Sequence, residues 1–143
     1  MFMKMNSMIN NFSVVIPVFN EEEIFLESAD KIFNICQEMN MPFEIIFSEN
    51  GSLDNTKNLI HAFIEDKDNC FTINSNYANY GLALKNGFEI AKNDIVISFD
   101  IDYFSKKFLK QSLELDENFV ALVASKRVNE SEDERTFIRR MAT

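Results

Sequence analysis

Short apolar runs alternate along this chain with longer segments in which apolar residues recur every three or four positions. The short runs predict buried β-strands, and the spaced pattern predicts amphipathic helices. The expected strands are 12–18, 43–47, 70–73, 95–99 and 119–124. The expected helices are 20–39, 54–66, 82–92, a short one after Ser105, and one in the tail, 129–143. This alternation predicts an α/β domain whose mostly parallel sheet carries helices on both faces.

The order of strands in that sheet follows from general rules of connection. Right-handed crossovers and one reversal of winding predict the order 3-2-1-4, with 119–124 adding a fifth strand. Ligands of such sheets bind beyond the carboxyl ends of the strands, near the point of reversal. The polar residues that follow strands one, two and four are therefore expected in one crevice: Asn20, Glu21, Ser48, Glu49, Asn50, Asp100 and Asp102.

Several polar residues and glycines are expected to begin or end these elements. Asn20 lies in a capping-box pattern with a glutamate three positions later, and Ser105 is placed to cap the fourth helix. Asn93 falls where a left-handed C-cap would follow the third helix. Gly51 and Gly87, two of only three glycines, are expected to mark a left-handed turn and a close helix contact.

Composition and charge narrow the classes of function. A chain of 143 residues without internal repeats fits one domain. The net charge of −9 argues against broad nucleic-acid or membrane adhesion, although the arginines all lie within 127–140. Cys36 and Cys70 lack metal-ligand spacing and predict buried free thiols in a reducing cytosol. The segment 1–11 lacks the apolar core of a signal peptide and is expected to be a flexible start of a cytoplasmic protein.

The most specific chemistry lies in Asp100 and Asp102, which end the expected fourth strand as "ISFDID". Two carboxylates this close repel each other unless a cation lies between them. Oxygen ligands without His or Cys nearby favour Mg²⁺ or Mn²⁺. Such an ion would let an acidic protein bind an anionic substrate. The pair fits a divalent-metal site, and it also fits two aspartates that cap a turn.

Four segments, in this order, resemble the family-2 glycosyltransferases of GT-A (Rossmann-like) fold. They are VVIPVFNEEE (14–23), EIIFSENGSLDNT (44–56), NYGLALKNGFEIAKNDIVISFDID (79–102) and SKRVNESEDERTFIRRMAT (125–143). The branch with dolichyl-phosphate and polyprenyl-phosphate mannosyl- or glucosyltransferases is the most similar. The resemblance implies sugar transfer from a donor of GDP-mannose or UDP-glucose type, with Mg²⁺ or Mn²⁺ as cofactor. The implied acceptor is a polyprenyl phosphate or a glycan, and a lipid acceptor implies a place at the inner face of the membrane.

The resemblance also assigns residues. The implied nucleotide-binding residues are Pro17, Phe19, Asn20, Glu21, Glu49, Asn50, Gly51, Ser52 and Asp100. The implied metal ligands are Asp100 and Asp102, and the implied phosphate contacts are Lys126, Arg127, Arg139 and Arg140. Lys85 is a further candidate for a phosphate contact. Glu49 and Asn50 replace the family's usual pair of aspartates, which leaves base selectivity open. Lys85 also fits a solvated helix lysine, and Tyr77 and Tyr80 fit either stacking on a base or packing within their loop.

No catalytic base is identified in the sequence, and the resemblance implies that such a base is absent or lies beyond Thr143, the last residue given. The helix pattern of 129–143 ends without a C-cap, so the chain is expected to be the N-terminal donor-binding part of a longer transferase. The alternative is a non-catalytic nucleotide-sugar-binding or assembly subunit that works with a partner chain.

Two other families fit the sequence less well. Haloacid-dehalogenase phosphatases place D-x-D after their first strand, whereas the pair here follows the expected fourth strand. Receiver domains need a phosphorylated aspartate where this chain has Asn74. Both families are therefore rejected.

Overall fold

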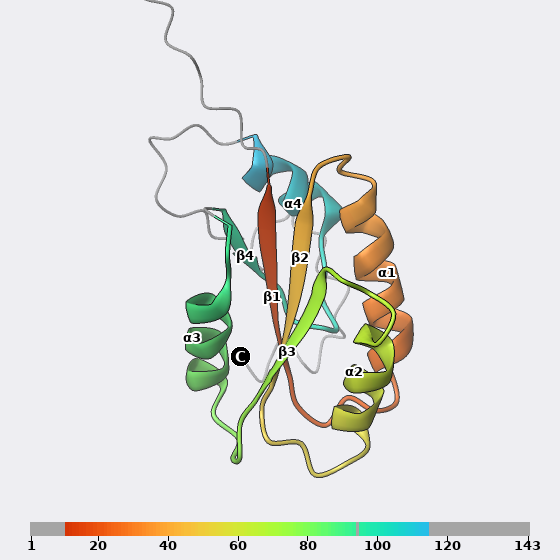
Figure 1. Cartoon of the computed structure of the whole chain (residues 1–143), viewed down its shortest axis with the longest axis vertical. Helices are drawn as coiled ribbons and strands as arrows, with labels where there is room; N and C mark the ends of the chain where they lie inside the picture. Colours follow the sequence, from red (N-terminus) through yellow and green to blue (C-terminus); the bar gives the residue numbers. More distant parts are fainter. Residues whose placement is uncertain (1–10, 94, 115–143) are drawn as a thin grey trace, which may run out of the picture.

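The computed structural model describes residues 11–93 and 95–114. Their elements are β1 (Phe12–Val18), α1 (Phe25–Gln37), β2 (Phe43–Glu49), α2 (Thr56–Ile64), β3 (Cys70–Asn74), α3 (Tyr80–Ile90), β4 (Val96–Ser98) and α4 (Lys106–Leu113). The strands form one parallel sheet of order β3-β2-β1-β4 (Figure 1), which confirms the predicted order. The expected fifth strand and tail helix lie outside the described residues. No helix in the described ranges is long and apolar enough to cross a membrane.

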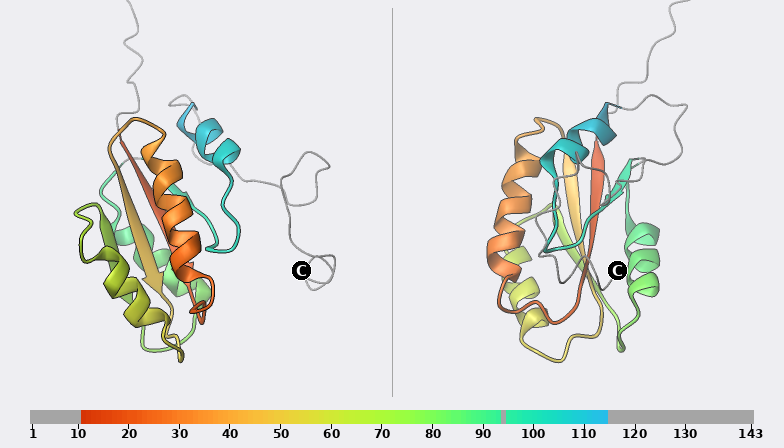
Figure 2. Two further views of the ribbon diagram at one scale, coloured as in Figure 1. Left: turned by 90° about the vertical axis from the view of Figure 1, so that its right-hand side faces the viewer. Right: turned by 180° about the vertical axis from the view of Figure 1, so that it is seen from behind.

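Helices cover both faces of this sheet. α1 and α2 lie on one face and α3 lies on the other, as Figures 1 and 2 show. Successive strand residues point to opposite faces. Phe12, Val14, Ile16 and Val18 accordingly belong to the main core, whereas Val15 faces α3. Every residue of β1 is buried, as expected for the central part of a parallel sheet covered on both sides.

The main core is built largely from phenylalanine rings. Phe25 of α1, Phe47 of β2 and Phe63 of α2 pack edge to face. The ring centroids are 5.2 Å apart for Phe25 and Phe47, 5.7 Å for Phe47 and Phe63, and 6.0 Å for Phe25 and Phe63. Such geometry places the positive edge of one ring against the negative face of another. Leu109 of α4 is fully buried in the same core, and the expected cap is confirmed because Ser105 Oγ accepts the Phe108 N–H. This packing fixes α1 and α2, whose first turns follow the loops of the candidate site.

α3 approaches the other face of the sheet closely. A Cβ atom on Gly87 would lie 2.3 Å from Cγ1 of Val15, so the predicted close contact is confirmed. Ser48 Oγ also donates a hydrogen bond of 2.6 Å to the Ala83 carbonyl. Because α3 follows a strand parallel to β1, its first turn lies at the carboxyl edge of the sheet. The close packing of α3 against the sheet therefore fixes that first turn relative to β1 and β2.

A buried polar cluster joins the elements at the amino edge of the sheet. Glu44 Oε1 accepts hydrogen bonds of 2.6 Å from both Ser13 Oγ and the Lys92 N–H. The Asn93 side chain donates to the Phe12 carbonyl at 2.8 Å. The expectation of a left-handed C-cap at Asn93 is wrong, because this residue does not have a positive φ. Its side chain serves β1 instead of the end of α3.

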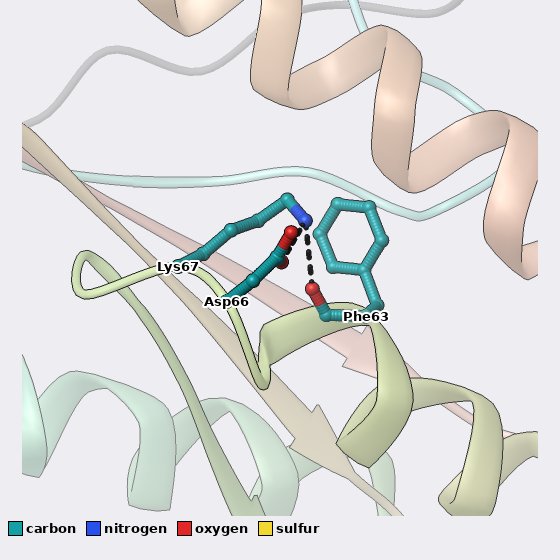
Figure 3. A network of polar contacts seen from close by, with 3 residues as sticks. All are labelled: Phe63, Asp66 and Lys67. Atoms are coloured by element: carbon teal, nitrogen blue, oxygen red, sulfur yellow. Dashed lines mark hydrogen bonds and ion pairs between the residues drawn. The ribbon is translucent and has the colours of Figure 1, made fainter.

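The last turn of α2 is closed by a lysine, as Figure 3 shows. Lys67 Nζ donates to the Phe63 carbonyl at 2.9 Å and pairs with Asp66 Oδ1 at 2.6 Å. The same ammonium group lies 4.3 Å from the centroid of the Phe63 ring. The hydrogen bond from Lys67 holds the pKa of Asp66 below its usual range. Exposed pairs of this kind contribute little to stability, so the satisfied helix carbonyl is the main effect.

Both cysteines are buried and free, as the sequence predicted. Burial raises the pKa of the Cys36 and Cys70 thiols from 9.0 to about 12. Both thiols therefore stay protonated near neutral pH and act as small apolar groups of the core.

Two glycines of α3 test the close packing of this helix. We expect Gly87→Ala to lower the free energy of unfolding by about 1–3 kcal/mol, because the added methyl group overpacks against Val15. Gly81→Ala is the matched control, since a Cβ there meets only Asn79 Oδ1, at 3.7 Å. Alanine favours a helix over glycine by about 1 kcal/mol, so this control should keep or raise stability. Urea unfolding measures both, and equal losses would contradict the packing described here.

Candidate functional site

β1 and β2 leave the sheet at the same level. Val18 is the register partner of Glu49, and the Asn50 N–H donates to the Val18 carbonyl at 2.9 Å. The loop after β1 (19–24) and the loop after β2 (50–55) therefore start side by side at the carboxyl edge. This is the edge at which the polar residues were predicted to converge.

Asn20 connects these two loops in both directions. Its N–H donates to Ser52 Oγ at 3.0 Å, and its side-chain Oδ1 accepts the Leu53 N–H at 2.8 Å. Asn20 has a φ of 52°, in the left-handed region that Asn tolerates better than most residues. The expectation that Asn20 caps α1 is wrong, because α1 begins later, after Ile24, and Asn20 is bonded across to the second loop.

A second set of hydrogen bonds joins the same two loops, and this contact region is called the loop junction below. The Glu21 N–H donates to Thr56 Oγ1 at 2.8 Å, and the Glu22 N–H donates to Asp54 Oδ2 at 3.2 Å. Asp54 Oδ1 also accepts the N–H of Thr56, the first residue of α2, at 3.0 Å. Although burial opposes the shift, hydrogen bonds from Thr56 and Glu22 hold the pKa of Asp54 below its usual range. Asp54 is thus an ionised part of the loop framework.

The residues 49–52 shape the loop after β2. Glu49 is only 1% exposed, and its Oε1 accepts the Ser52 N–H at 2.5 Å. Gly51 has a φ of 75°, and a Cβ there would lie 2.8 Å from the backbone carbon of Tyr77, so the predicted left-handed turn is confirmed. Asn50 Oδ1 accepts the Asn79 N–H at 2.7 Å. Asn50 therefore links this loop to the first turn of α3.

The first turn of α3 also contacts Asp100 of the acidic pair. Asn79 caps this helix through a 2.9 Å bond from the Leu82 N–H to its Oδ1. The Tyr80 hydroxyl donates to Asp100 Oδ1 at 2.8 Å. Partial burial, the hydrogen bond to Asp100 and the negative charges of Asp100 and Asp102 raise the pKa of Tyr80 to about 12. Tyr80 is therefore a neutral donor near neutral pH.

Asp100 and Asp102 lie just beyond β4, on a short turn closed by a 3.1 Å bond from the Tyr103 N–H to the Asp100 carbonyl. Asp100 is half-buried and Asp102 is exposed. Their oxygens suit Mg²⁺ or Mn²⁺, which bind few protein carboxylates and complete their shell with water and phosphate. Within 11–93 and 95–114, no group of three or more His, Cys, Asp or Glu side chains is arranged to hold a metal ion.

The structure brings together some of the predicted site residues and not others. Those at the carboxyl edge are Pro17, Phe19, Asn20, Glu21, Glu49, Asn50, Gly51, Ser52, Asp100 and Asp102. Lys85 is exposed on α3, where it pairs with Glu89 at 3.7 Å, as expected for a solvated lysine.

The expected tail contacts and the expected position of a base are not among the residues that the structure describes. Lys126, Arg127, Arg139 and Arg140 lie outside the described residues, as does Thr143, beyond which a catalytic base was expected. The description ends at residue 114. The expectation that a catalytic base is absent, or lies beyond Thr143, therefore stays a prediction.

Sequence reasoning missed the links made by Asn79 and Tyr80. It placed the start of α3 at Leu82, two residues after its first residue in the structure. An N-cap pattern was present in "NYGL", where an asparagine precedes the helix, but Gly81 weakened the helical signal. The bond from Tyr80 to Asp100 has no local signal, because it joins residues 20 positions apart.

Comparison with known proteins gives concordant results. Residues 13–142 match the family model "Glycosyl transferase family 2". An undecaprenyl-phosphate 4-deoxy-4-formamido-L-arabinose transferase of Proteus mirabilis is 34% identical over 97 residues, which are 66% of this chain and 29% of that protein. The protein of the same description from Yersinia pestis (strain Pestoides F) is 33% identical over 103 residues, 70% of this chain and 31% of that one. The chain therefore spans less than a third of the length of these relatives.

A solved structure shares the fold. The crystal structure of S. aureus TarS superposes with a TM-score of 0.56, at 23% identity, over 71% of this chain and 18% of that chain. The superposition supports the GT-A architecture of the sheet and its helices.

The loop junction at Asn20 can be tested by stability. We expect Asn20→Ala to lower the free energy of unfolding by about 1–3 kcal/mol, because alanine fits the left-handed region poorly and loses the bond to Leu53. Asn20→Gly should lose less, about 1 kcal/mol, since glycine adopts a positive φ without strain. Asn76→Ala, at an exposed asparagine outside the junction, is the control. Urea unfolding of the three variants ranks them, and an Asn20→Ala variant as stable as the control would refute the junction.

Proposed function

Because the chain belongs to glycosyl transferase family 2, we propose that its described residues form the donor-binding portion of an enzyme that transfers a sugar to a polyprenyl phosphate. The relatives named above are undecaprenyl-phosphate sugar transferases, which is the reason for choosing this acceptor. The proposed donor is a nucleotide-diphosphate sugar of GDP-mannose or UDP-glucose type. A polyprenyl acceptor would place the protein at the cytoplasmic face of a membrane.

One observation carries this proposal, namely the continuous set of hydrogen bonds along the carboxyl edge of the sheet. Asn20 bonds to Ser52, Asn50 bonds to Asn79, and Tyr80 bonds to Asp100. These contacts join the loops after β1 and β2, the first turn of α3 and the loop after β4. Ligands of parallel sheets bind at this edge because the loops there meet near the reversal of strand order.

We assign the nucleoside to the loops after β1 and β2. Phe19 is 39% exposed and offers an apolar surface for a base, and Pro17 is a buried residue near the end of β1. Asn20, Glu21, Gly51 and Ser52 would supply polar contacts. Glu49 and Asn50 already bond to their own surroundings through Oε1 and Oδ1, so we assign them the role of shaping this loop.

We assign the diphosphate to the region of Asp100 and Asp102, which would hold Mg²⁺ or Mn²⁺. A bound divalent cation would stabilise the negative charge that develops on the departing nucleoside diphosphate. The proposed phosphate contacts are Lys126, Arg127, Arg139 and Arg140, which lie outside the described residues. Lys85, which pairs with Glu89 on the exposed side of α3, is not among them. Arginine suits this role because its planar donors match phosphate oxygens in pairs.

The nature of the acceptor decides whether a base is needed. A phosphate acceptor is already ionised near neutral pH, since its second pKa is about 6. It can attack the anomeric carbon without first losing a proton to the protein. A glycan hydroxyl would instead need a carboxylate base, and we assign none among the described residues. The polyprenyl phosphate proposed from the relatives is therefore an acceptor that does not require a base.

A second candidate is a nucleotide-sugar-binding unit without turnover, acting with a partner chain. Its support is the set of contacts at the carboxyl edge, which donor binding without transfer would use equally. Both candidates require donor binding, and they differ only in transfer.

Calorimetry can test the shared requirement. We expect GDP-mannose or UDP-glucose to bind with Mn²⁺, and binding to disappear with chelator. Asp102→Ala should weaken it by at least about tenfold, because even a group that only supports a metal ligand contributes that much. Asp68→Ala, an exposed aspartate between α2 and β3, is the matched control and should bind as the wild type does.

The two candidates are separated by adding a polyprenyl phosphate to the same mixture and following the sugar into lipid. Transfer identifies an enzyme, and metal-dependent binding without transfer identifies a binding unit. If a folded sample binds neither donor with or without Mn²⁺, the proposed donor site is wrong.

A further inference from the structure

Tyr80 is an aromatic residue whose hydroxyl bonds to Asp100 of the acidic pair. Its hydroxyl donates to Asp100 Oδ1 at 2.8 Å, while 54% of its surface is exposed. An exposed tyrosine needs no protein acceptor, because water can bond to its hydroxyl. A hydrogen bond from a neutral donor to a carboxylate keeps the carboxylate charged and fixes its orientation.

Three contacts fix the position of the helix turn that carries Tyr80. The N–H of the preceding Asn79 donates to Asn50 Oδ1 at 2.7 Å, and Asn79 caps α3 through Leu82. Farther along the helix, Gly87 packs against Val15 without room for a Cβ atom. The Tyr80 hydroxyl is therefore presented by a fixed helix turn, and Asp100 is the group that it orients.

We propose that Tyr80 is a positioning residue for the acidic pair. It holds Asp100 through Oδ1 and so fixes the orientation of a carboxylate that would bind a divalent cation. It also couples the pair to the loop after β2 through Asn79 and Asn50. This inference rests on the proposed function, because it assumes that Asp100 and Asp102 hold a cation. Groups that hydrogen-bond to ligating carboxylates typically contribute 10–100-fold to metal affinity.

The composition of the chain provides an optical readout. The chain has three tyrosines, Tyr77, Tyr80 and Tyr103, and no tryptophan. Tb³⁺ is a hard cation that takes oxygen ligands, and its emission rises when a nearby excited tyrosine transfers energy to it. The emission falls steeply with distance, so a Tb³⁺ ion at Asp100 would be sensitised mainly by tyrosines beside that carboxylate.

The experiment is a Tb³⁺ titration of the full chain, with tyrosine excitation, followed by displacement with Mn²⁺. It compares the wild type with Tyr80→Phe, Tyr77→Phe and Asp100→Asn. We expect Tyr80→Phe to bind Mn²⁺ at least about tenfold more weakly and to give lower emission at saturation. Tyr77→Phe removes the same hydroxyl group three positions earlier and should keep the wild-type affinity. Asp100→Asn should give no saturable emission that Mn²⁺ displaces.

The outcomes separate this inference from the proposed function. A Tyr80→Phe variant that binds Mn²⁺ as tightly as the wild type, or more tightly, overturns the role of Tyr80 and leaves the donor site standing. A wild type without Mn²⁺-displaceable emission overturns both the metal site and the positioning role. Thermal unfolding of the tyrosine variants checks that the fold is intact, and a purely structural role of Tyr80 would move the unfolding temperature but not the affinity for Mn²⁺.

Discussion

The parallel pairing of β1 with β2 is the contact on which the rest of this structure depends. The seven residues of β1 are register partners of the seven residues of β2, ending with Val18 opposite Glu49. The backbone bond from Asn50 to Val18 continues the ladder one step beyond the strands. Since both strands end together, the loops that follow them begin side by side. A shift of one residue would reverse the faces of β1 and separate Asn20 from Ser52 and Leu53.

The remaining parts of the site are placed relative to this pair of loops by packing and by single hydrogen bonds. Gly87 lets α3 lie close to Val15, and Asn50 joins the first turn of α3 to the loop after β2. Tyr80 then reaches Asp100, which follows β4 on the other side of β1. In a chain of net charge −9, this arrangement places the carboxylates of Asp100 and Asp102 at one edge. It suits an anionic substrate only if a cation accompanies that substrate.

The sequence predicted the parts of this account that depend on local patterns. Continuous apolar runs located the strands, and the rules of strand connection gave their order. The scarcity of glycine drew attention to Gly51 and Gly87, whose neighbours leave no room for a side chain. Asn20 and Asn93 were misassigned as helix caps because their partners lie 33 and 81 positions away, where no local pattern can indicate them. The metal ligands and phosphate contacts stay predictions.

The most direct test of the central claim is to locate a bound nucleoside diphosphate by nuclear magnetic resonance of the isotope-labelled chain with Mg²⁺. The account predicts that the largest changes in amide chemical shift fall in 19–22, 50–54, 79–82 and 100–103. The amino edge of the sheet, 42–44 and 91–93, should change little. Changes concentrated at the amino edge, or no changes with a folded protein, would contradict a nucleotide site at the carboxyl ends of β1, β2 and β4.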